Sequence, residues 1–125
     1  MAVNDNRMVP FSCYNSKVKF PTTLTVYGDI WKVKLLTPKT IERVFGMVLL
    51  GGVDFDTKII RVDKTLPNEL KWSVLLHEIL HIAFRLCNSD GYVDGDHIEE
   101  QLVTRLEQPL FKILHENFQF GSPNK

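Results

Sequence analysis

The feature that most limits how this chain can fold is an apolar stretch from about Asn68 to Cys87 that contains the run HEILH. Its apolar residues recur at helical spacing and cover most of the circumference, which predicts a helix buried on several sides. The remaining strip is polar and carries His77, Glu78 and His81. We therefore expect a core helix with a cleft along one polar line. The apolar residues are Trp72, Leu75, Leu76, Ile79, Leu80, Ile82, Ala83, Phe84 and Leu86.

The spacing of the two histidines suits a metal ion. Because an α-helix turns by about 100° per residue, positions four apart lie one above the other, so His77 and His81 can bind the same ion. Zinc accepts imidazole ligands, and a catalytic zinc takes three protein ligands and leaves its fourth position to water. In an HExxH motif the glutamate, here Glu78, accepts a proton as zinc-bound water attacks a carbonyl. The sequence thus predicts a catalytic Zn2+ site with Glu78 as general base.

A second helix, expected from about Asp96 to His115, supplies candidates for the third ligand. On a helical projection Glu99 falls in the middle of the apolar sector, whereas Glu100 lies at its far edge and His97 points roughly the opposite way. A buried carboxylate is costly unless it is paired or binds a metal, so we expect Glu99 to be the third ligand. The apolar residues of this sector are Ile98, Leu102, Val103, Leu106, Leu110, Ile113 and Leu114.

Several alternatives to Glu99 stay open at this stage. Glu99 can instead be a glutamate near a helix start, where the helix dipole favours negative charge, and Glu100 can be the ligand. The loop NSDGYVDGDH does not match a calcium loop. If Gly95 took the place of the EF-hand glycine, Tyr92 and Gln101 would occupy positions where ligands are required. It is read as a polar turn whose side chains are further candidate ligands, since zinc also accepts carboxylate and histidine. These loop candidates are Asp90, Asp94, Asp96 and His97.

The residues before the metal helix predict short strands. Residues 24–36 alternate apolar and polar residues around a break at Gly28 and Asp29, which indicates two strands. Thr37 followed by Pro38 is typical of a helix start, so residues 37–46 predict a short helix or turn. Two apolar runs then flank residues 54–58, as expected for a hairpin. The fold class is therefore α+β, with a short mixed or antiparallel sheet packed on the HExxH helix and a second C-terminal helix.

Composition limits the domain plan and the partners. A chain of 125 residues with 44% hydrophobic and 24% charged residues is typical of one soluble domain. We expect an arm at residues 1–17, the domain at 18–115 and a tail at 116–125. Fifteen basic residues balance fifteen acidic ones, which indicates neither nucleic acid nor a membrane surface as a partner. Without a signal peptide or a CxxC pair, the expected location is cytoplasmic. The oligomeric state is open.

The strands, the HExxH helix and the following glutamate-bearing helix resemble the zincin metallopeptidase core, and among zincins the glutamate class. Residues 48–114 are distantly similar to ImmA/IrrE-type and phage-borne metallopeptidase domains. The resemblance implies a protein or peptide substrate, aligned by the strand near Ile59 to Val62 through backbone pairing with an exposed edge. It also implies the residues that bind zinc and act as base, which are His77, His81, Glu99 and Glu78.

Three questions about the site stay open. The oxyanion of the reaction needs a hydrogen-bond donor, and no spacing favours one candidate over another. The site can also serve a zinc-binding regulatory or partner-binding protein of phage or mobile-element type without turnover, or the domain can be free of metal. A nuclease fits less well because magnesium prefers carboxylate-dominated ligand sets. The candidate oxyanion donors are Tyr27, Tyr92, His97 and His115.

Overall fold

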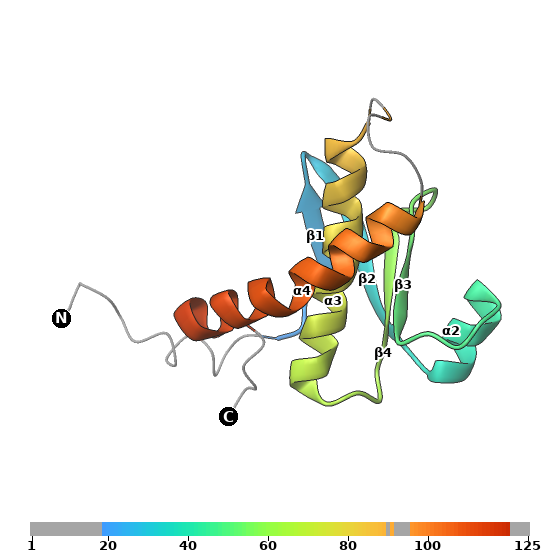
Figure 1. Cartoon of the computed structure of the whole chain (residues 1–125). Helices are drawn as coiled ribbons and strands as arrows, with labels where there is room; N and C mark the ends of the chain where they lie inside the picture. The colour runs from blue at the N-terminus through green and yellow to red at the C-terminus, as the bar shows by residue number, and fades with distance from the viewer. Residues whose placement is uncertain (1–18, 90, 92–95, 121–125) are drawn as a thin grey trace.

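The computed structural model describes residues 19–89, 91 and 96–120, and its sheet has four strands in the order β1-β2-β4-β3. β2 and β4 run parallel, whereas β1 pairs with β2 and β3 with β4 in antiparallel fashion. The predicted α+β class is confirmed, and the sheet is mixed (Figure 1). The strands are β1 (Thr23–Val26), β2 (Asp29–Leu36), β3 (Gly51–Asp54) and β4 (Ile59–Asp63).

The first two strands form the hairpin that the alternation predicted. The chain turns at Tyr27 and Gly28, both with positive φ, of 49° and 85°. In β2, Trp31 and Val33 are buried and Lys32 between them is exposed, so one face of the sheet meets the core and the other meets solvent.

Helix α2 (Pro38–Phe45) follows β2 and confirms the predicted short helix. The Thr37 side chain caps it by accepting a hydrogen bond from the Thr40 backbone N–H, and Gly46 ends it in the left-handed conformation at φ 77°. Ile41 is fully buried, and α2 contacts β3 and β4. The helix therefore covers part of the sheet beside its β3 edge.

The predicted hairpin of β3 and β4 is present, with the Asp54 side chain accepting hydrogen bonds from the backbone N–H groups of Asp56 and Thr57. The predicted substrate edge at Ile59 to Val62 is wrong, because β4 lies inside the sheet between β2 and β3. Apolar alternation identifies a strand but not its neighbours. The exposed edge beside the hairpin is β3.

Helix α3 spans Asn68–Cys87, the bounds expected from the sequence. Its buried residues Leu75 and Ile82 pack on Ile60 and Val62 of β4, so α3 covers one face of the sheet (Figure 1). The last turn departs from the expectation of burial, because Leu86 is 44% exposed and Ala83 is exposed as well. These two residues line a surface hollow together with Val26 and Tyr27 of the first hairpin.

Helix α4 (Asp96–Phe118) crosses α3, which is the element it mainly contacts (Figure 1). It ends three residues beyond the predicted His115. The predicted apolar sector is only partly buried. Val103 is 2% exposed and packs inside, but a helix resting on one neighbour buries a narrow stripe. The sector residues left exposed are Ile98, Leu102, Leu106 and Ile113.

The expected arm at residues 1–17 lies outside the described residues. Within the part of the chain that the structure describes, no helix has both the length and the apolar character that a membrane span requires.

Candidate metal centre

The two motif histidines lie side by side on α3 with their ring centroids 5.0 Å apart. Nε2 of His77 is 3.5 Å from one carboxylate oxygen of Glu100, and Nε2 of His81 is 3.1 Å from the other. One ligand atom from each of these three residues lies within 4.8 Å of the other two. The structure therefore brings together two imidazole nitrogens and one carboxylate from two helices, which is a donor set that zinc accepts.

The opposite ring nitrogens are held by two other glutamates of α4. Nδ1 of His77 lies 3.1 Å from Oε1 of Glu107, and Nδ1 of His81 lies 2.5 Å from Oε2 of Glu99. Ser73 donates a hydrogen bond to Glu107, and Nε of Arg85 donates to Glu99 at 3.1 Å. Both imidazoles are thus bound at Nδ1 and present Nε2 to the same place.

Glu99 is buried as predicted, with 3% of its surface exposed. Its carboxylate nevertheless contacts Nδ1 of His81 and Nε of Arg85. Glu100 is the glutamate that faces both histidines. The helical projection placed Glu100 at the sector's edge, and the crossing of α4 over α3 turns this edge toward the histidines. The geometry therefore favours Glu100 over the predicted Glu99 for the third ligand position.

Glu78 lies in the same groove as the histidines and is 6% exposed. Burial disfavours its charged form and raises the pKa of its carboxyl group from 4.5 to about 7, although the neighbouring His77 and His81 act in the opposite direction. The carboxylates of Glu100 and Glu107 add to the increase. A carboxyl group with a pKa near neutrality is suited to both accepting and releasing a proton.

Acidic groups outnumber basic groups around the histidines. Four carboxyl groups lie around two imidazoles and the guanidinium group of Arg85, which is permanently charged. A divalent cation beside both Nε2 atoms would offset this excess of acidic groups. The donor set and its charge therefore fit zinc. The four carboxyl groups belong to Glu78, Glu99, Glu100 and Glu107.

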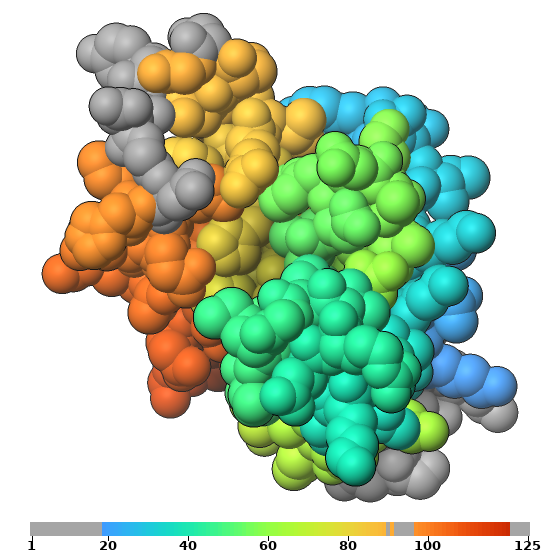
Figure 2. All heavy atoms as spheres, turned by 90° about the vertical axis from the view of Figure 1, so that its right-hand side faces the viewer, coloured from blue at the N-terminus to red at the C-terminus, as the bar shows by residue number. Residues whose placement is uncertain are grey.

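A groove with a volume of about 500 Å³ runs past the histidines between α4 and the β3 edge. Figure 2 shows it between the orange α4 and the green β3 region, with the yellow α3 at its floor. Gly51 and Gly52 line it, and neither accepts a side chain. A Cβ at Gly51 would lie 2.7 Å from both the Arg61 carbonyl oxygen and Val74, and one at Gly52 would lie 2.5 Å from the Phe45 ring. This edge of the sheet is accessible from the site.

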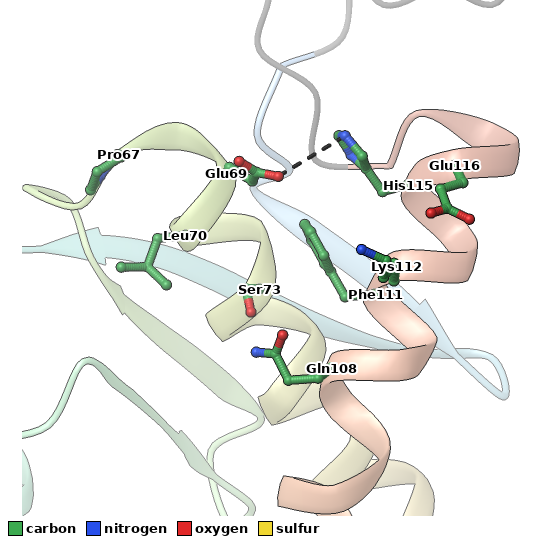
Figure 3. A pocket seen from close by; sticks show the side chains of 9 residues that line it. All are labelled: Pro67, Glu69, Leu70, Ser73, Gln108, Phe111, Lys112, His115 and Glu116. Carbon is green, nitrogen blue, oxygen red and sulfur yellow. Dashed lines mark ion pairs between the residues drawn. The ribbon is translucent and has the colours of Figure 1, made fainter.

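Another cavity, of about 530 Å³, lies between the start of α3 and the end of α4 (Figure 3). Glu69 and His115 face each other across it at 4.0 Å. Ser73 lines this cavity and also a smaller one that reaches His77. The cavity thus adjoins the histidine site without containing it.

Three of the other predicted site residues are described by the structure, and they lie outside the cluster formed with the histidines. His97 is exposed and does not belong to the cluster with His77 and His81. Neither Tyr27 nor His115 lines the groove beside the histidines. The remaining candidates lie outside the described residues or have side chains that are not described, and these are Asp90, Tyr92, Asp94 and Asp96.

The sequence analysis did not predict that Glu107 belongs to the site. It lies four residues after the buried Val103, which in turn lies four residues after Glu99, so the three share one ridge of α4. Two acids on a single ridge facing the HExxH helix are a signal that the sequence contains. Comparison of the chain with protein-family models, curated proteins and solved structures found no match.

Proposed function

We propose that this protein is a zinc-dependent metallopeptidase that hydrolyses a peptide bond of a protein substrate, with zinc held by His77, His81 and Glu100. The observation that carries the proposal is the convergence of two Nε2 atoms and one carboxylate beside the buried Glu78. Zinc bound there would polarise the scissile carbonyl and lower the pKa of the attacking water.

Glu78 is the proposed general base. Its carboxylate takes a proton from the attacking water and passes it to the nitrogen of the leaving amine. The pKa of about 7 supports both halves of this transfer, because the group exchanges a proton near neutral pH. Its burial also keeps bulk water away from the carboxylate, so the proton stays in the groove.

The β3 edge is the proposed binding strand for the substrate. An extended peptide can pair its backbone with the unpaired side of β3, which borders the groove that contains His77 and Glu78. Gly51 and Gly52 of this strand line the groove beside the histidines. The peptide would then lie between β3 and α4, above the histidines.

Metal analysis of protein purified without chelator is the first test. We expect one zinc per chain, which is lost in His77→Ala and His81→Ala and kept in Glu69→Gln. Glu69 is a suitable control because it lies on the same helix with a side chain that is 62% exposed. A zinc-free wild-type protein would contradict the proposal and leave a metal-free domain.

Turnover is tested with Glu78→Gln, which keeps the shape of the side chain but cannot act as a base. The variant should retain zinc and lose cleavage by at least about 100-fold, as expected for removal of a general base. Incubating active and Glu78→Gln protein with lysate from the source, followed by mass spectrometry, should identify a protein that the active form cuts and the variant traps. Zinc binding with no cut protein would instead indicate the non-catalytic binding module.

A further inference from the structure

We propose that Glu107 and Glu99 are positioning residues that orient the two imidazoles toward the metal, with Ser73 and Arg85 holding these carboxylates in place. The inference rests on the proposed zinc site but not on peptide hydrolysis. Ser73 lies on α3, four residues before the HExxH motif, whereas Glu107 lies on α4, far from the motif in the sequence.

The pairing sets the proton positions of the rings. An ionised carboxylate only accepts hydrogen bonds, so a neutral imidazole beside it carries its hydrogen on Nδ1. With zinc bound, the contacts of His77 with Glu107 and of His81 with Glu99 would therefore leave the lone pair of each Nε2 for the metal. Both Nε2 atoms face Glu100, where the metal is expected.

Each carboxylate is fixed by a second donor on α3. In Glu107 one oxygen binds His77 and the other accepts from Ser73, while Glu99 divides its oxygens in the same way between His81 and Arg85. The Glu107 side chain is 16% exposed and that of Glu99 is 4% exposed, so little water competes for these bonds.

The four partners on α3 follow one line of the helix. Ser73, His77, His81 and Arg85 are each four residues apart, so they lie along a single face with the histidines in the centre. The facing ridge of α4 runs in the opposite direction, because Glu99, which comes before Glu107 in the chain, binds His81, which comes after His77. The buried Val103 lies between the two glutamates on that ridge. The result is one network in two similar halves.

A role in stability alone would give a different result from a role in positioning. A structural ion pair affects the free energy of unfolding but leaves the metal affinity of the folded protein unchanged. A positioning carboxylate affects metal affinity, and its removal typically weakens it about 10- to 100-fold. A metal ligand would additionally change the coordination sphere when it is replaced.

The closing experiment measures zinc affinity by competition with a chromogenic chelator. We expect Glu107→Ala to bind zinc about 10- to 100-fold more weakly than wild type. Glu107→Gln should recover part of this loss, because its amide oxygen still accepts from Nδ1–H of His77. Glu116→Gln serves as the control, since Glu116 is an exposed glutamate of the same helix. Wild-type affinity in folded Glu107→Ala would overturn the inference.

Cobalt substitution and nitrogen NMR separate positioning from ligation. The visible spectrum of the Co2+ form should keep its shape in Glu107→Gln and Glu99→Gln but change in Glu100→Gln. In the zinc-bound protein, the Nδ1–H signal of His77 should be protected from exchange with water in wild type and should exchange faster in Glu107→Ala. An unchanged exchange rate would contradict the inference even where the alanine variant is less stable. A wild-type protein that binds no zinc would overturn the metal site itself, which is a separate outcome.

Discussion

Glu78 is almost fully buried, and its carboxyl group ionises near neutral pH. Its position between His77 and His81 in the sequence places it on the helix that packs on the sheet, and burial then raises its pKa. The same burial that suits a general base also opposes folding at high pH. This consequence is measurable without any substrate.

We predict that Glu78 makes the zinc-free protein less stable as the pH rises. The unfolded chain ionises this carboxyl group above about pH 4.5, whereas the folded protein keeps it protonated up to about pH 7. The neutral form is thus favoured in the folded state, and its stabilising contribution is present below pH 4.5 and is lost as pH rises through 7. The shift corresponds to a free energy on the order of 3 kcal/mol.

Urea unfolding with chelator present, at pH 4.5 and pH 8, tests this prediction. Relative to wild type, Glu78→Gln should gain stability as the pH rises, because a glutamine does not titrate. Glu69→Gln should follow the wild-type pH dependence, since the exposed Glu69 side chain lies outside the site. Parallel curves for wild type and Glu78→Gln would show that burial does not shift the pKa of Glu78.

At the scale of the elements, α4 shows how a helix can carry more apolar residues than it buries. It rests mainly on α3, so the ridge with Glu99, Val103 and Glu107 faces inward while Leu106 is 51% exposed. The hydrophobic pattern of the sequence includes both ridges and does not distinguish them. The acids on the inner ridge are tolerated because His77, His81 and their neighbours bind them.

A pair of substitutions on α4 tests this orientation. Val103→Ala should lower the free energy of unfolding by roughly 1–3 kcal/mol, because it removes buried methyl groups and leaves a cavity. Leu106→Gln should change it by less than about 0.5 kcal/mol, as is usual for exposed positions. Chemical denaturation of both variants provides the measurement. A larger loss for Leu106→Gln than for Val103→Ala would mean that the other ridge faces α3.

On the scale of the whole molecule, the candidate metal centre connects parts that the sheet does not hold together. α3 packs on the sheet, whereas α4 mainly contacts α3, and the candidate ligands come from both helices. A bound ion would therefore cross-link α4 to the rest of the fold. Metal binding and the stability of the domain should then be linked.

We accordingly predict that zinc raises the melting temperature. Free zinc at about 100 times its dissociation constant stabilises the folded state by about 2.7 kcal/mol, which corresponds to roughly 10 °C for a domain of this size. Thermal unfolding with zinc and with excess chelator measures the shift. His77→Ala should show no such difference, which separates site-specific binding from a general effect of the ion. An equal shift in His77→Ala would contradict the linkage.

The sequence by itself determined the features that depend on neighbouring residues. The bounds of α3, the Thr37 cap and the β3–β4 hairpin follow from spacing, capping and turn residues, which act within a few positions of the chain. The pairing of His77 with His81 on one helical face follows from the same local geometry. These features were predicted correctly for that reason.

The tertiary structure alone decided the features that depend on how distant elements meet. The strand order makes β3 the edge and places Ile59 to Val62 inside the sheet, although both strands have apolar patterns. The crossing of α4 over α3 places Glu100 next to the Nε2 atoms of both histidines and Glu99 next to Nδ1 of His81, although these glutamates are adjacent in the chain. A rotation of one helix against another exchanges such neighbours, and no local spacing encodes that angle.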